Sequence, residues 1–263
     1  VTRLPEAQPG WCATPEPSPA ATQETHADQR SGVARLAAGD GQWDPATPPT
    51  EIDMMILYTP RALATHGDEA ALRRGIRKMM DDATRSYTNS LIGVRLNPVF
   101  IGLHPTWVES GNMLTDFNAM FADARITDWR NAYKADLVCM VIESDANDYG
   151  GAATLLSVPA GDPNRSMAIM RRGVFIGNPR WAEHASLTLT HEVGHILGAG
   201  HDREHGYPSA WQGNPAAFPF SNGYRFEASG VTYRTAMAYD PGIQLGLFSN
   251  PNLTFDGVPL GVP

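Results

Sequence analysis

The feature that most constrains this chain is the run of residues 191–202, which reads H-E-V-G-H-I-L-G-A-G-H-D. Residues four apart on a helix project from one face, so His191 and His195 are predicted to point to one place. Gly198 is predicted to end that helix in the left-handed conformation, so that the chain turns back and delivers His201 as a third ligand. Three protein ligands with a fourth position left open are typical of a catalytic zinc ion.

Glu192 follows the first histidine of this run and is the predicted general base. Its carboxylate would lie close enough to take a proton from water without itself binding the metal. The alternative interpretation is a solvated helix whose histidines bind nothing, and the third histidine at this offset argues against it.

A second motif, T-A-M-A-Y at residues 235–239, follows the histidine run. Together the two motifs resemble the metzincin metalloendopeptidases, in which a Met-turn follows the zinc helix and places a methionine beneath the metal. The resemblance assigns that position to Met237; without it, this methionine would be ordinary core. It implies an α/β fold with a twisted mixed sheet, two long helices, a zinc helix and a loop-rich C-terminal part resting on the Met-turn.

Further motifs narrow the resemblance to the bacterial peptidyl-Asp metalloendopeptidases. They are D-x-M-x-x-Y-T-P from Asp53, Y-R-T-x-M-A-Y around the Met-turn, and F-S-N-P-N from Phe248. The resemblance covers residues 51–263 and implies protein or peptide substrates and one catalytic Zn²⁺, with calcium left open. It leaves open whether Arg171, Arg172, Arg225 or Arg234 could face an acidic substrate side chain.

The metzincin resemblance suggests two further roles. In astacins and serralysins a tyrosine two residues after the methionine stabilises the oxyanion, and Tyr239 holds that position here; the alternative is simple packing. Metzincin substrates pair with an edge strand above the cleft. By order along the chain this strand is assigned to Gly151, Ala152, Ala153 and Thr154, and the alternative there is an ordinary glycine loop.

Residues 1–50 differ from the remainder, because they are rich in proline and show no convincing helix or strand. We interpret them as a pro-segment or linker, with the catalytic domain at 51–263, divided near residue 201. Cys12 has three readings: a thiolate that binds the zinc and keeps the enzyme latent, similar to the cysteine switch of matrix metalloproteinases; a disulfide with Cys139; or an idle thiol. Cys139 lies in an apolar run and is predicted to pack in the core as a small apolar side chain.

The coarse pattern predicts strands at 52–60, 94–103 and 136–142, and a short one at 167–170. It predicts helices at 67–90 and 111–132, and a zinc helix that begins near Asn178. His184 and His205 are expected to be structural, and Asp202 is expected to make hydrogen bonds rather than join the metal.

A formal net charge of −8 without a long basic run argues against nucleic-acid binding. There is no apolar stretch of the length a membrane span needs. The chain starts at Val1 rather than at an initiator methionine, as expected for a secreted protein whose signal peptide has been removed, although an arbitrary boundary of the sequence would look the same. We also expect a monomer. The alternative function is a zinc-binding pseudo-protease that serves as a binding or toxin module, but such a protein would not need Glu192.

Overall fold

The structure is a computed structural model that describes residues 11–15, 33–35, 43–143, 149–155, 166–172, 184–203 and 216–262. Of residues 11–15, 33–35, 149 and 184–186 it describes the backbone alone. His205 and the expected helix start near Asn178 lie outside the described residues, and His184 is placed only as the first residue of a helix.

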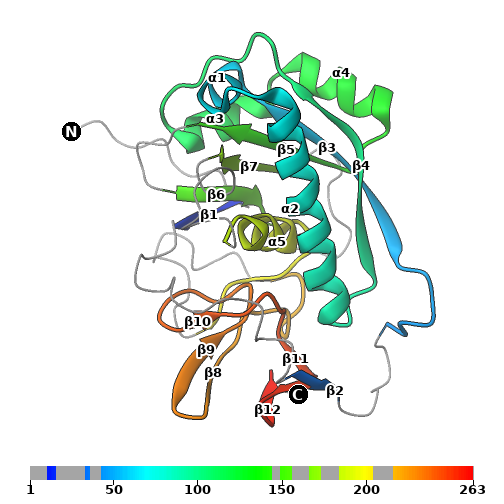
Figure 1. Ribbon diagram of the computed structural model, residues 1–263, viewed down its shortest axis with the longest axis vertical. Coiled ribbons are helices and arrows are strands. Elements are labelled where there is room, and N and C mark those ends of the chain that lie inside the picture. The colour runs from blue at the N-terminus through cyan, green and yellow to red at the C-terminus, as the bar shows by residue number, and fades with distance from the viewer. Residues whose placement is uncertain are drawn as a thin grey trace.

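A six-stranded mixed sheet forms the upper part of the molecule (Figure 1). Its strands, in spatial order, are β1 (Trp11–Pro15), β6 (Tyr149–Thr154), β7 (Met167–Arg171), β5 (Leu137–Ile142), β3 (Thr50–Tyr58) and β4 (Val94–Leu103). The four strands from β7 to β4 run parallel, whereas β6 is antiparallel to β7 and β1 is antiparallel to β6. All six residues of β5 are buried, as expected for a central strand covered on both faces.

Helices cover both faces of this sheet. The helices among the described residues are α1 (Pro60–His66), α2 (Glu69–Asn89), α3 (Met113–Met120), α4 (Ala124–Tyr133) and α5 (His184–Ile196). Alternate residues of β3 enter two separate cores: Ile56 packs with residues of α2 and α5, and Leu57 packs with residues of α3 and α4. No helix among the described residues is both long enough and apolar enough to span a membrane.

The metzincin-type α/β fold is confirmed, but two predicted details are wrong. The helix expected over 111–132 is two helices, because the first ends at Met120 and Asp123 then caps the second by accepting a hydrogen bond from the Ile126 amide. These helices lie on the opposite face of the sheet from α2, so α2 is the one long helix that lies on the same face as the zinc helix α5.

The N-terminal segment and the lower part hold more strand than expected. The lower part contains one sheet of β8 (Arg225–Ala228), β9 (Val231–Arg234) and β10 (Ile243–Gln244), and another of β2 (Val33–Arg35), β11 (Asn250–Phe255) and β12 (Val258–Leu260). Both β1 and β2 come from the segment expected to lack strands. They form by pairing with distant partners, which compensates for the weak local preference of a proline-rich sequence. Figure 1 shows α5 between the large sheet and these small sheets.

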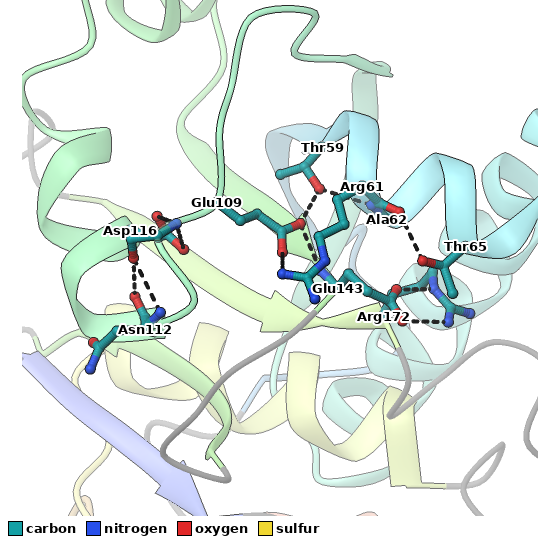
Figure 2. Close-up of polar contacts among 10 residues, drawn as sticks. Thr59, Arg61, Ala62, Thr65, Glu109, Asn112, Asp116, Glu143 and Arg172 are labelled. Carbon is teal, nitrogen blue, oxygen red and sulfur yellow. Dashed lines mark hydrogen bonds and ion pairs between the residues drawn. The ribbon is translucent and has the colours of Figure 1, made fainter.

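A polar cluster fixes the carboxyl ends of β3, β5 and β7 (Figure 2). The buried carboxylate of Glu109 accepts hydrogen bonds from the Thr59 hydroxyl and, at 2.9 Å, from the Glu143 amide. Arg172 in turn makes a two-pronged contact with the Glu143 carboxylate, with Nη2 donating at 2.9 Å. The cluster holds the end of β7, the last described strand before α5. Its polar groups make hydrogen bonds and ion pairs with one another.

Candidate metal centre and active site

The helix α5 ends as its sequence predicts. The Leu197 amide still donates to the Val193 carbonyl, and Gly198 then adopts a φ of 95° in the left-handed region. The Ala199 amide donates back to the Gly194 carbonyl, so the chain reverses at once. The reversal brings His201 back beside the two helix histidines.

Three buried imidazoles meet at this point. The Nε2 atoms of His191, His195 and His201 lie 3.0 Å from one another in all three pairs. They form the one cluster of possible metal ligands found among the described residues. The structure therefore brings the three predicted ligands together.

The protonation pattern of these rings fits a bound cation. His191 Nδ1 lies 2.8 Å from the Ala236 carbonyl oxygen and His195 Nδ1 lies 2.8 Å from that of Ala199. Since a carbonyl only accepts, each Nδ1 must carry the hydrogen, which leaves a lone pair on each Nε2. Lone pairs converging at 3.0 Å repel one another. A Zn²⁺ ion about 2.0–2.1 Å from each nitrogen fits over such a triangle and removes the repulsion.

Burial also keeps these imidazoles neutral. Desolvation lowers the pKa of His191 to about 4, an effect that the Ala236 hydrogen bond opposes and Arg234 reinforces. Desolvation likewise lowers the pKa of His195 and His201 well below the usual histidine value. Neutral imidazole is the form that binds a metal, so the site is prepared for one at neutral pH.

Glu192 lies buried between α5 and β6. A Cβ atom on Gly151 would come 2.8 Å from Glu192 Oε1, so the bare glycine backbone leaves room for the carboxylate. Burial and, to a smaller extent, the charge of Glu192 raise the pKa of the Cys139 thiol. Cys139 therefore stays protonated in the core, as its expected filler role requires.

Met237 lies beneath α5. A Cβ atom on Gly194 would meet its sulfur at 2.7 Å, so the missing side chain at Gly194 leaves the room that this contact needs. Gly223 approaches the other side of the turn, where an added Cβ would come 2.6 Å from the backbone of Met237 and Ala238. The Met-turn is thus held between two glycines.

Tyr239 and Asp202 lie beside the third ligand. The ring of Tyr239 is centred 4.0 Å from that of His201, tilted by 41°. Asp202 Oδ1 accepts from the Tyr239 amide at 2.9 Å and Oδ2 accepts from Arg225 Nη2 at 2.8 Å. Asp202 therefore makes the hydrogen bonds expected of it.

Several of the arginines considered for an acidic substrate side chain form ion pairs within the chain. Arg172 pairs with Glu143, Arg225 with Asp202, and Arg234 with Asp240. No local pattern predicts that Arg225 and Arg234 reach the turn around Met237, because these contacts depend on the hairpin of β8 and β9. Nor does the sequence mark Gly223, whose only local signal is an Asn-Gly pair typical of a turn.

The sheet register excludes a disulfide between the two cysteines. Cys12 lies opposite Ala153, Ala153 opposite Ala168, and Ala168 opposite Cys139. Three steps of about 4.8 Å between strands separate the cysteine backbones by roughly 14 Å, whereas a disulfide needs Cα atoms within about 7 Å. Cys139 is accordingly a free thiol.

A sheet-and-helix fold in which three buried histidines converge is typical of a metallopeptidase, and comparison with known families agrees. Residues 49–249 match the family model Reprolysin_5, metallo-peptidase family M12, and the chain belongs to this family.

Curated relatives and one solved structure extend the comparison. The chain is 28% identical to a peptidyl-Asp metalloendopeptidase of Stenotrophomonas maltophilia (strain R551-3), over 89% of this chain and 51% of that protein. It is 27% identical to one of Xanthomonas campestris pv. campestris, over 81% of this chain and 47% of the relative. The chain thus spans about half the length of these relatives. A solved structure titled "Structure of a chaperone-substrate complex" shares the fold, with a TM-score of 0.61 and 17% identity over 84% of this chain and 33% of that one.

Proposed function

We propose that this chain is the catalytic part of a zinc-dependent endopeptidase with Glu192 as general base. The observation that carries the proposal is the triangle of three buried Nε2 atoms 3.0 Å apart, formed by His191, His195 and His201. These residues would hold the ion. When bound, Zn²⁺ supplies Lewis acidity, which lowers the pKa of water and polarises a peptide carbonyl.

Glu192 would take a proton from the attacking water and pass it to the leaving amine. Its position supports this role, because the carboxylate is fully buried against the glycine backbone of β6 and belongs to the same helix as His191 and His195. Removal of water from such a site strengthens the electrostatic effect of each charge in it.

Glu192→Gln tests the proposal. We expect this variant to bind zinc as the parent does, because the three ligands are intact, and to lose about 10²–10⁴-fold in kcat on a protein substrate. Metal content by elemental analysis and peptide release are measured on the same samples. Glu51→Gln, at a surface carboxylate that pairs with Arg95, is the matched control and should behave like the parent. Hydrolysis by Glu192→Gln at the parental rate would refute the assignment. A parent that holds zinc and cleaves nothing, even without residues 1–42, would favour the pseudo-protease.

We propose further that substrate adds as a strand to β6. The chain itself supplies the precedent, because β1 pairs antiparallel with β6 from Trp11 opposite Thr154 to Thr14 opposite Gly151. Gly151 is also the residue that lies against Glu192, so a strand added here passes close to the proposed base. Main-chain hydrogen bonds of this kind give affinity without fixing the substrate sequence.

The same pairing supports latency. A substrate strand and β1 would compete for one edge, so residues 1–50 would act as an autoinhibitory pro-segment. Cys12, opposite Ala153, would then offer its thiolate as a fourth zinc ligand. An idle thiol is the remaining alternative.

Tyr239 would donate a hydrogen bond to the oxyanion that develops during attack. Its ring lies 4.0 Å from that of His201, which supports this role. We also propose that the protein is secreted and that its substrates are proteins or peptides. A proteome-derived peptide library would identify the residues at each cut and show whether the Asp in the name of the relatives applies here.

A further inference from the structure

We propose that Arg225 and Arg234 are a pair of positioning residues that clamp the turn 236–242 and thereby orient His191 and His201. The inference rests on the zinc site of the proposed function, and it adds two residues that lie outside the histidine run 191–202 and the T-A-M-A-Y motif. The two arginines face each other across the hairpin, since Arg225 of β8 pairs with Arg234 of β9.

Arg225 joins the third ligand to the turn. Its Nη2 donates to Asp202 Oδ2 at 2.8 Å and to the Tyr239 carbonyl at 2.9 Å. Asp202 in turn accepts from the Tyr239 amide at 2.9 Å. The residue after His201 is thus tied to both backbone polar groups of Tyr239, through one carboxylate and one guanidinium.

Arg234 holds the middle and the C-terminal end of the same turn. Its Nη1 donates to the Ala238 carbonyl at 2.7 Å and its Nε donates to the Gly242 carbonyl at 3.0 Å. Its Nη2 lies 3.1 Å from Asp240 Oδ1. A guanidinium can do this because its donors are fixed in one plane, whereas an ammonium is a single point of charge.

The clamped turn reaches two of the three imidazoles. The Ala236 carbonyl receives the His191 Nδ1 hydrogen at 2.8 Å and so fixes which nitrogen of that ring faces the metal. His201 is held through its neighbour Asp202. His195 is instead oriented by the Ala199 carbonyl, just after the end of α5. Partners of metal ligands set ring orientation, and their loss typically costs about 10–100-fold in metal affinity.

The test uses Arg225→Lys and Arg234→Lys in the full chain. Lysine keeps the charge opposite Asp202 and Asp240 but cannot reproduce the planar fork. We expect zinc release to a chelator to be about 10–100-fold faster than in the parent, and the absorption spectrum of the Co²⁺-substituted protein to change. Arg95→Lys, at a surface pair with Glu51 that is 58% and 55% exposed, is the matched control and should change neither.

Parental zinc release and Co²⁺ spectra in both lysine variants, with only a lower unfolding midpoint, would make the arginines a brace for the hairpin and overturn the inference. If a lysine variant does not fold, the double variant Arg225→Met with Asp202→Asn removes that ion pair without stranding either charge. It should also release zinc faster, and parental release would again overturn the inference. Neither the zinc-release measurement nor the Co²⁺ spectrum requires a substrate. A parent without zinc would defeat the proposed function, whereas a zinc-loaded parent with unaffected variants would defeat only the clamp.

Discussion

A histidine can bind a metal through either ring nitrogen, and the hydrogen bond at the other nitrogen decides which one. His191 and His195 both give their Nδ1 hydrogen to a backbone carbonyl at 2.8 Å, one in the Met-turn and one just past the helix. The orientation of His191 therefore depends on Ala236, a residue that the histidine motif does not contain.

Tyr239 lies beside His201, and its hydroxyl has a predicted chemical role. Tyr239→Phe should lower kcat by about 10²-fold or more with little change in KM, because one hydrogen-bond donor to the oxyanion is lost. Tyr224→Phe, in the neighbouring core of the lower part, controls for the loss of a hydroxyl. Steady-state kinetics on one peptide decide the matter, and an unchanged kcat in Tyr239→Phe would leave the ring as packing alone.

At the scale of the elements, α5 and the Met-turn touch through glycine. Gly223→Ala should cost about 1–3 kcal/mol in the free energy of unfolding, because the new methyl would meet the backbone of Met237 and Ala238 at 2.6 Å. Gly194→Ala should cost less, since its methyl meets side-chain atoms of Met237 and Phe248, which can shift more readily than backbone, and alanine favours a helix by about 1 kcal/mol.

Urea unfolding of the two alanine variants and the parent measures the difference. Gly246→Ala is the control, because its nearest atom would be a leucine methyl 3.3 Å away. A larger loss in Gly194→Ala than in Gly223→Ala would contradict this description of the contact.

The sequence predicted those elements whose patterns involve residues close together along the chain. The zinc helix, its left-handed end at Gly198 and the apolar stripe of α2 follow from residues three to five apart, so the sequence alone indicated them. The helix break at Asp123 was missed because an N-cap inside an apolar pattern looks like a helical residue.

Contacts between distant segments could not be predicted in this way. The strand β1 exists because it pairs with β6, more than a hundred residues later, and its own residues favour no strand. Likewise, the reach of Arg225 and Arg234 to the turn depends on a hairpin whose placement is set by the packing of the lower part. The meeting of the three histidines was predictable from the sequence, but the contacts that Arg225 and Arg234 make with the turn were not.

For the whole molecule, the position of β1 predicts latency in the uncleaved chain. Cys12→Ser should raise peptidase activity, because serine is a weaker zinc ligand than a thiolate. Cys139→Ala also removes one thiol, but from the core, and should not relieve latency. Activity assays before and after removal of the N-terminal segment provide the comparison. Equal latency in Cys12→Ser and the parent would show that the thiol is idle.

The central claim is that three imidazoles, brought together by one helix and the turn after it, bind a zinc ion. Zinc K-edge X-ray absorption on the metal-replete chain tests it most directly. The account predicts one zinc per chain with three imidazole nitrogens at about 2.0–2.1 Å, together with a sulfur at about 2.3 Å if Cys12 is bound. It also predicts loss of this signal in His201→Ala. A chain that takes up no zinc, or a zinc environment unchanged in His201→Ala, would contradict it.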